Sequence, residues 1–114
     1  MDEVLYLNDL FDIYGELLTD KQQDYFRDYY FDNLSYGEIA SKYDVSRNAI
    51  FKQLKFGTDK LKELEDILHI YEKNNKIRDL INNTSDEKIV KELEKLLWKK
   101  ILDIIKYLSL IFYL

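Results

Sequence analysis

The chain has 114 residues, enough to bury one hydrophobic core but not two, so we expect a single domain spanning residues 1–114. It contains no cysteine and no proline, which excludes a disulfide framework and a thiolate metal site and favours an all-α fold with few sharp turns. Its net charge of −5 has the wrong sign for a protein that binds nucleic acid over its whole surface. The acidic start Met1-Asp2-Glu3 is not that of a secretory signal, and we expect a cytoplasmic protein.

The charge is distributed unevenly along the chain. Residues 1–34 carry nine acidic and two basic side chains, a net charge of −7. Residues 35–62 carry six basic and three acidic side chains, a net charge of +3, and the remainder sums to −1. A local basic stretch predicts a local electrostatic contact rather than a global one.

The first predicted helix runs from about Asp2 to Leu18, with an apolar stripe at helical spacing. Thr19-x-x-Gln22 has the pattern of a capping box and predicts a second helix that ends near Tyr30. Acidic residues recur every four positions from residue 12 to residue 32, and such a run is normally solvated surface. Its functional alternative is a strip that repels misplaced phosphate or docks a basic protein.

Residues 35–55 have the pattern of a helix-turn-helix, within a predicted core of residues 19–56. Ser35-x-x-Glu38 is a capping box, and the small Ala40 lies where a second helix must cross closely. Asp44-Val45 makes the short connection, Asp tolerates the unusual backbone of a tight turn, and Ser46 caps the next helix. Ile50 and Leu54 then point inward at i, i+4 spacing.

The outer face of this second helix is the candidate nucleic-acid contact. With about 100° between successive residues, the side chains that share one arc away from Ile50 and Leu54 are Arg47, Asn48, Phe51, Lys52 and Lys55. Arg47 and Asn48 are candidate base readers, whereas the lysines suit phosphates. Lys42, from the same basic stretch, joins the candidate set. In the alternative interpretation the lysines are solvated surface and Phe51 packs on a neighbouring helix.

After Ile50 the apolar positions continue in alternating steps of four and three, through Gly57 and Leu61 to Tyr71. This heptad pattern predicts that the recognition helix continues as a long arm over residues 57–81. The arm packs either on its own chain or on a second copy, so we expect a homodimer as one outcome. The residues predicted for a dimer or partner interface are Leu61, Leu64, Leu68, Tyr71, Ile104 and Leu108.

A polar break at residues 82–85 precedes a last predicted helix over 85–114, where Thr84-x-x-Glu87 is a third capping box. Its apolar end, from Ile101, is shorter than the roughly 20 residues needed to span a bilayer. We expect it to pack on a partner, with a membrane-surface helix as the alternative.

The sequence offers no enzymatic chemistry. His69 is the only histidine, so it forms neither a metal cluster nor a relay to a nucleophile. The three glycines are scattered and make no phosphate-binding loop. We expect no catalytic residue, no metal and no cofactor.

Three motifs together resemble one family: LT-x-x-Q at residue 18, Ser-x-Gly-Glu-Ile-Ala at residue 35, and Val-Ser-Arg-x-Ala-Ile at residue 45. They resemble the YlxM family of small bacterial helix-turn-helix proteins and, more distantly, region 4 of RNA polymerase sigma factors. The resemblance implies an all-α protein with a regulatory link to the signal recognition particle pathway, a link based on gene neighbourhood. By position, Arg47 and Asn48 match the polar start of the family's recognition helix.

Two hypotheses follow. In the first, the chain is a nucleic-acid-binding regulator that contacts DNA or structured RNA, with the particle's RNA as the target that the resemblance implies. In the second, it is a protein–protein adaptor that docks the targeting GTPase or dimerises, and the helix-turn-helix is scaffold.

Overall fold

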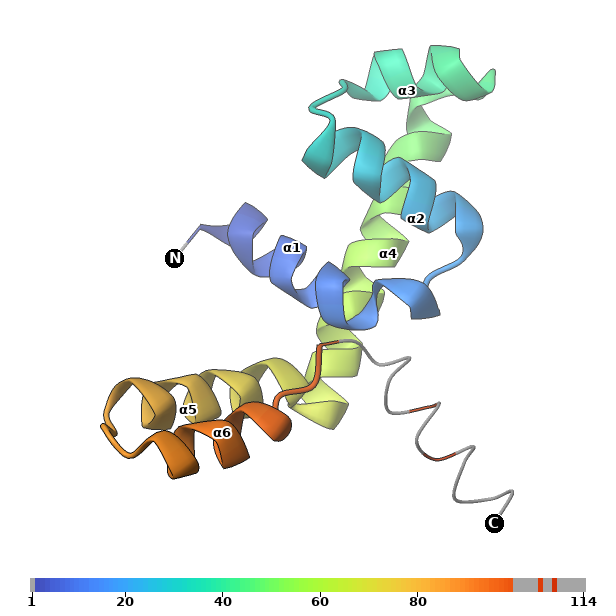
Figure 1. The fold of residues 1–114 in the computed structure, drawn as a ribbon. Coiled ribbons are helices and arrows are strands. Elements are labelled where there is room, and N and C mark those ends of the chain that lie inside the picture. Colours follow the sequence, from blue (N-terminus) through green and yellow to red (C-terminus); the bar gives the residue numbers. More distant parts are fainter. Residues whose placement is uncertain (1, 100–104, 106–107, 109–114) are drawn as a thin grey trace.

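The structure, a computed structural model, describes residues 2–99 together with 105 and 108. The regular elements of this part are all helical, which confirms the predicted all-α fold (Figure 1). In chain order they are α1 (Glu3–Tyr14), a short 3-10 turn η1 (Gly15–Leu17), α2 (Asp20–Phe26), a π-helical turn η2 (Arg27–Phe31), α3 (Tyr36–Tyr43), α4 (Arg47–Leu68), α5 (Ile70–Asn82) and α6 (Glu87–Lys95).

Local capping bonds set the starts of α2, α3 and α4, as predicted. Thr19 and Gln22 exchange side chain-to-backbone hydrogen bonds at 3.1 and 3.2 Å, and Ser35 and Glu38 do the same. Ser46 Oγ accepts a hydrogen bond from the third amide of α4 at 3.0 Å. These bonds satisfy N–H groups that have no partner inside the helix, so each start is fixed by residues close in sequence.

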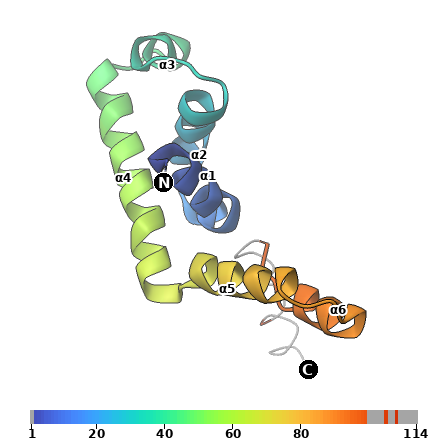
Figure 2. The same cartoon turned by 90° about the vertical axis from the view of Figure 1, so that its left-hand side faces the viewer.

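The core lies between α4 and the three helices that precede it. Figure 2 shows α4 as a long rod with α1, α2 and α3 stacked along one side. Side chains from all four helices meet there with almost no exposure, namely Leu10, Tyr14, Phe26, Ile39, Ile50 and Leu61. The rings of Phe11 and Phe26 stack at 4.2 Å and hold α1 on α2. One continuous core therefore fixes the orientation of α4.

The heptad pattern of α4 packs on its own chain. Ile50, Leu54, Gly57 and Leu61 are buried, and Leu64 lies half-buried against the same core. The pattern allowed this helix to pack either on its own chain or on a second copy. The structure shows it packed on helices of its own chain.

The predicted uninterrupted arm through residues 57–81 is wrong, because the helix breaks at His69. This residue adopts the left-handed conformation, with φ of 56°, and its N–H donates to the Glu65 carbonyl at 2.8 Å. A left-handed residue ends an α-helix. Helix α5 then leaves α4 in a new direction and, with α6, forms a hairpin beside the body (Figure 2).

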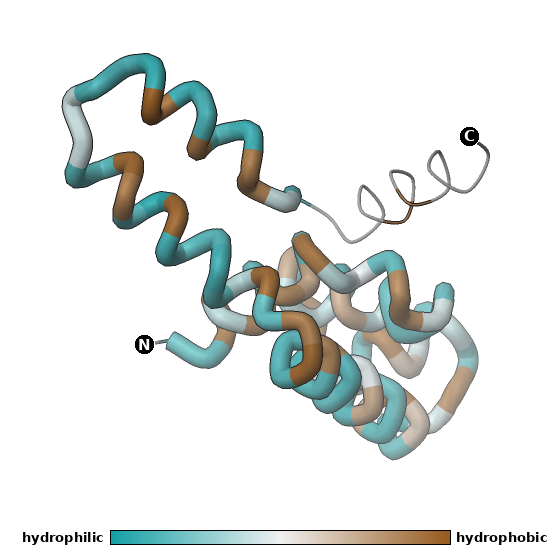
Figure 3. Tube along the Cα trace, turned by 90° about the horizontal axis from the view of Figure 1, so that it is seen from below, coloured by the Kyte–Doolittle hydropathy of each residue, from teal (hydrophilic) through white to brown (hydrophobic). Residues whose placement is uncertain are grey.

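The hairpin carries apolar residues at intervals along both of its helices, as Figure 3 shows. Helix α6 begins two residues later than its predicted capping box implies. Asp86 is the N-cap, accepting from the amides of Lys88 and Ile89, while Thr84 Oγ1 accepts from the Asp86 amide. The predicted Thr84–Glu87 box is therefore wrong, because the carboxylate of Asp86 takes the capping role.

A single helix over residues 85–114 is also wrong in its described part. Helix α6 ends at Lys95, and residues 97–99 have no regular structure. Buried Asn74 holds this segment, since its Nδ2 donates to the Trp98 carbonyl at 2.7 Å and its Oδ1 accepts from the Trp98 amide at 3.2 Å. Residues 100–104 and 109–114, part of the predicted partner-packing segment, lie outside the described residues.

Candidate nucleic-acid interface

The start of α4 is held by a helix-turn-helix whose connection follows the predicted pattern. Asp44 takes the left-handed conformation, with φ of 55°, and the Val45 amide donates to the Ala40 carbonyl at 3.0 Å. Asp tolerates this backbone better than most side chains. Ile39 and Ile50 are fully buried on the inner sides of α3 and α4. The outer side of α4 is therefore turned away from the core.

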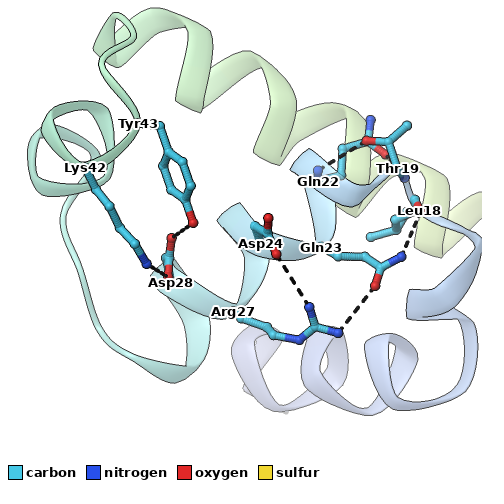
Figure 4. Close-up of polar contacts among 9 residues, drawn as sticks. All are labelled: Leu18, Thr19, Gln22, Gln23, Asp24, Arg27, Asp28, Lys42 and Tyr43. Carbon is cyan, nitrogen blue, oxygen red and sulfur yellow. Dashed lines mark hydrogen bonds and ion pairs between the residues drawn. The ribbon is translucent and has the colours of Figure 1, made fainter.

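A buried carboxylate locks α3 to the preceding helices. Asp28, in η2, accepts from Lys42 Nζ at 2.9 Å and from Tyr43 Oη at 2.7 Å (Figure 4). Asp28 is only 4% exposed, so its expected place in a solvated acidic row is wrong. Burial and the bond from its hydroxyl to Asp28 raise the pKa of Tyr43. A buried charge requires such partners, which fixes the pairing of η2 with α3.

This pairing changes the place of Lys42 in the candidate set. Its hydrogen bond to Asp28 raises the pKa of Lys42, so the ammonium stays charged but is already paired inside the chain. Lys42 also lies on α3 rather than on the outer arc of α4. The candidate surface therefore consists of the α4 residues.

The five predicted arc residues are all exposed on the first turns of α4, and they are Arg47, Asn48, Phe51, Lys52 and Lys55. Lys55 Nζ lies 3.3 Å from a carboxylate oxygen of Asp59, and both side chains are more than half exposed. Such a surface pair contributes little and exchanges readily with another anion. We define these five residues as the cationic arc.

The outer face of α4 changes sign beyond the cationic arc. Asp59, Glu63 and Asp66 are exposed at the positions that follow it along the helix. Two cations lie among them: Lys60 Nζ is 4.0 Å from Glu63, and Lys62 Nζ is 2.6 Å from Glu3 of α1. The three exposed acidic residues outnumber these two lysines, so the half of α4 away from the turn is net negative and disfavours a polyanion.

Arg47 depends on a neighbour that the sequence pattern did not identify. Its guanidinium lies against Gly37 of α3, where a Cβ atom would come within 3.1 Å of Nε and Nη2. Such contacts are tighter than usual, so the absent side chain of Gly37 leaves room for this position of Arg47. Only the packing of α3 on α4 reveals this relationship.

Phe51 also contacts α3 but remains 47% exposed. Its ring meets that of Tyr36 edge-on, with centroids 6.0 Å apart. Both interpretations of Phe51 are thus partly realised, since it packs on a neighbouring helix and yet faces solvent. Phe56, 56% exposed on the same helix, was not among the predicted residues.

The residues predicted for a dimer or partner interface are separated by the fold. Leu61 is fully buried in the chain's own core, which leaves it unavailable to a second copy. Tyr71 packs edge-on against Tyr6, with ring centroids at 5.2 Å. Leu68 and Leu108 are 38% and 46% exposed, and Ile104 lies outside the described residues.

The other members of the acidic row are exposed along the chain from α1 to the end of η2. Asp12, Glu16, Asp20, Asp24 and Asp32 are at the surface. Arg27 contacts Asp24 at 3.8 Å and lies over the ring of Phe11, so this row is partly neutralised within the chain (Figure 4).

His69 contacts the Glu72 carboxylate at 3.1 Å, and both side chains are half exposed. Over residues 2–99, with 105 and 108, no three His, Cys, Asp or Glu side chains are grouped closely enough to bind a metal ion. Within the same described part, no helix has both the length and the apolar character that crossing a membrane requires.

Comparison with known proteins agrees with the helix-turn-helix. Residues 1–101 match the model of the UPF0122 family, described as "Putative helix-turn-helix protein, YlxM / p13 like". A UPF0122 protein of Geobacillus is 37% identical over 109 residues, 96% of both chains. A UPF0122 protein of Ureaplasma urealyticum is 46% identical over 89 residues, 78% of this chain and 90% of the relative. Another, of Shouchella clausii, is 44% identical over 81 residues, 71% of this chain and 74% of the relative.

The match covers every helix from α1 to α6, including the turn that presents the cationic arc. The chain therefore belongs to the UPF0122 family, the YlxM/p13-like helix-turn-helix proteins.

Proposed function

We propose that this protein is a non-enzymatic regulator that binds nucleic acid through the cationic arc of α4. The observation that carries the proposal is the grouping of three exposed cations, with no acidic residue among them, at the start of the second helix of a helix-turn-helix. In this motif that helix end contacts nucleic acid, and the first helix crosses the backbone. The rest of α4 carries more exposed acidic than basic side chains, which favours contact at this end.

The side chains of the arc suit different parts of a nucleic acid. Arg47, whose guanidinium is planar, and Asn48, whose amide both donates and accepts, fit base edges. Lys52 and Lys55 fit phosphates, because an ammonium acts as a point charge. DNA and structured RNA are both candidate targets, and RNA of the signal recognition particle is the candidate that the family resemblance adds.

The test is a titration of duplex DNA and of structured RNA at several salt concentrations. We expect the double substitution Arg47→Glu with Lys52→Glu to weaken binding strongly and to lower the salt slope by about one, because Lys52 is the phosphate contact of the pair. Lys88→Glu with Lys91→Glu on α6 is the matched control, because it changes the net charge equally at exposed sites away from the arc. Equal losses of affinity in both pairs would show that the arc is not the contact.

The adaptor is the second candidate function, and exposed apolar side chains of the α5–α6 hairpin favour it. Leu80 and Leu96 are each 57% exposed, and Ile89 is 48% exposed. Exposed apolar surface of this kind is typical of protein contacts when it is contiguous. A pull-down from lysate with and without nuclease separates the two functions, since a protein partner retained after nuclease supports the adaptor. The targeting GTPase and a second copy are the partners to look for first.

A further inference from the structure

A row of aromatic rings runs from the cationic arc onto α3 and η2. Phe51 contacts Tyr36 edge-on at 6.0 Å, and Tyr36 stacks on Tyr29 at 4.9 Å with the ring planes 19° apart. Tyr29 in turn meets Tyr30 edge-on at 4.9 Å. The ring at the α4 end, that of Phe51, is nearly half exposed. The row therefore ends in an accessible aromatic surface inside the arc.

Cationic side chains lie on both sides of the Phe51 ring along α4. Phe51 lies between Arg47 and Lys55 on the helix, and Lys52 follows it directly. Arg47 reaches the start of α3 at Gly37, next to Tyr36. A ligand that covers Phe51 therefore also meets cations on both sides, which suits a ligand with a flat ring and flanking phosphates.

The surface beyond Tyr36 has the opposite character. A hollow of about 510 Å³ is lined there by Tyr29, Tyr30, Tyr36 and Glu38, among others. The Glu38 carboxylate disfavours a phosphate in this hollow, whereas an uncharged ring is not repelled. The phosphates of a bound strand are therefore expected to contact α4. Only its uncharged bases are expected to contact the surface of α3.

We propose that the exposed ring of Phe51, supported by Tyr36, is a stacking site for an unpaired base of a single-stranded or looped nucleic acid. This inference rests on the proposed function and narrows its ligand class. Bases inside a duplex already stack on both faces, so a protein ring gains access only to bases that are unpaired. The cations of the arc then bind the phosphates on either side of that base.

The test uses three probes with equal numbers of phosphates: an RNA hairpin with an unpaired loop, a fully paired RNA duplex and a single-stranded DNA. We expect Phe51→Leu, which keeps the apolar character but removes the ring, to weaken hairpin binding roughly 10-fold and duplex binding less than about 2-fold. The salt slope stays unchanged because no charge is altered. Phe56→Leu is the matched control, an exposed ring on the same helix outside the aromatic row.

A 2-aminopurine in the loop gives a second readout. Stacking on the ring quenches its fluorescence in the wild-type complex, and Phe51→Leu restores the emission. If single-stranded DNA and hairpin RNA bind equally well, the protein recognises the unpaired base alone. If RNA binds better, the same site also contacts the ribose 2′-hydroxyl.

Two failures are distinguishable. If the wild type binds hairpin and duplex equally and Phe51→Leu changes neither, the stacking site is overturned while nucleic-acid binding stands. If no probe binds, or if the Arg47→Glu and Lys52→Glu pair loses no affinity, the proposed function fails and the stacking site fails with it.

Discussion

Tyr14 of α1 donates a hydrogen bond of 2.6 Å to the carboxylate of Glu65 on α4, and the two residues lie 51 positions apart in a buried site. The same carboxylate accepts from the amides of Tyr71 and Glu72 at 2.9 and 3.1 Å, and Tyr14 Oη accepts from the Ile70 amide at 3.2 Å. Helix α5 has no side-chain cap from His69. Its first amides are thus capped by side chains of α1 and α4, which fixes the direction in which α5 leaves.

We first predict that Glu65→Ala destabilises the fold by about 3 kcal/mol or more, because it removes hydrogen bonds to a charged acceptor and leaves buried donors unpaired. Tyr14→Phe costs about 2 kcal/mol, since the hydroxyl loses its bond to Glu65 and the Ile70 amide loses its acceptor, while the ring remains. Urea unfolding gives both values. Glu63→Ala, at a nearby exposed site on the same helix, is the control and has a small effect. A loss of stability at Glu65 no larger than that at Glu63 would contradict the capping role.

The second prediction concerns alkaline pH. Burial and the hydrogen bond to Glu65 raise the pKa of Tyr14 well above the ordinary value of 10.0. The folded state therefore holds this proton more tightly than the unfolded state, and the stability it contributes is fully present below pH 10. That stability is lost as the pH rises from 10 through the folded pKa.

Spectrophotometric titration and unfolding as a function of pH check this prediction. Burial also raises the pKa of Tyr36, to about 12, and the pKa of Tyr30. A late-titrating group of tyrosines is thus expected, and Tyr14→Phe removes one member of it. The variant also loses less stability than the wild type above pH 10. A titration in which every tyrosine ionises near pH 10 would refute this.

The third prediction compares two glycines. A Cβ atom at Gly57, in the middle of α4, would lie 3.6 Å or more from Gln22 and Leu18, which is ordinary contact. Gly57→Ala therefore stabilises the protein by about 1 kcal/mol through helix propensity and a less flexible unfolded chain. At Gly15 the same atom would come within 2.9 Å of the buried Phe11 ring. Gly15→Ala is destabilising, and thermal melts of the two variants should move in opposite directions.

The fourth prediction separates binding from stability at Gly37. Gly37→Ala places a Cβ atom 3.1 Å from the Arg47 guanidinium, which must shift by a few tenths of an ångström. We expect melting to stay unchanged or to rise, because Ala favours helix. Nucleic-acid affinity falls roughly 3-fold, since Arg47 leaves its position. An affinity that rises or stays constant would show that Gly37 does not position Arg47.

Sequence patterns identified the elements whose determinants are local. The caps of Thr19 and Ser35 need partners only three residues away, and the inward positions of Ile50 and Leu54 follow from helical spacing. The outward arc followed from the same geometry, because it is the opposite side of those two residues.

The remaining features depend on contacts between distant segments. The break at His69 has no glycine or proline to mark it and is maintained by Glu65 with Tyr14. Asp28 belongs to a regular acidic row, and only the approach of α3 with Lys42 explains why it is buried. A heptad pattern records which residues are apolar but not whether the packing helix comes from the same chain.

The last prediction uses the single tryptophan as a reporter of the segment after α6. Asn74 is 1% exposed, and its side-chain amide makes both hydrogen bonds to the Trp98 backbone, at 2.7 and 3.2 Å. Asn74→Ala removes both, so the segment detaches from α5 and the indole moves further into water. We expect a red shift of tryptophan emission and faster amide exchange at residues 96–99, with little change in global unfolding because local opening costs less than complete unfolding.

Asn75→Ala is the control, because within the described residues the bond of this neighbouring amide is a 3.4 Å contact from Arg78 on the same helix. Identical emission in wild type and Asn74→Ala would contradict attachment through Asn74. Since Trp98 is the only tryptophan in the chain, the red shift reports this segment alone. The same variant also tests whether the segment contributes to binding: the cationic arc lies on α4 and should keep its affinity for nucleic acid, whereas a partner that docks on the α5–α6 hairpin should lose affinity when the segment detaches.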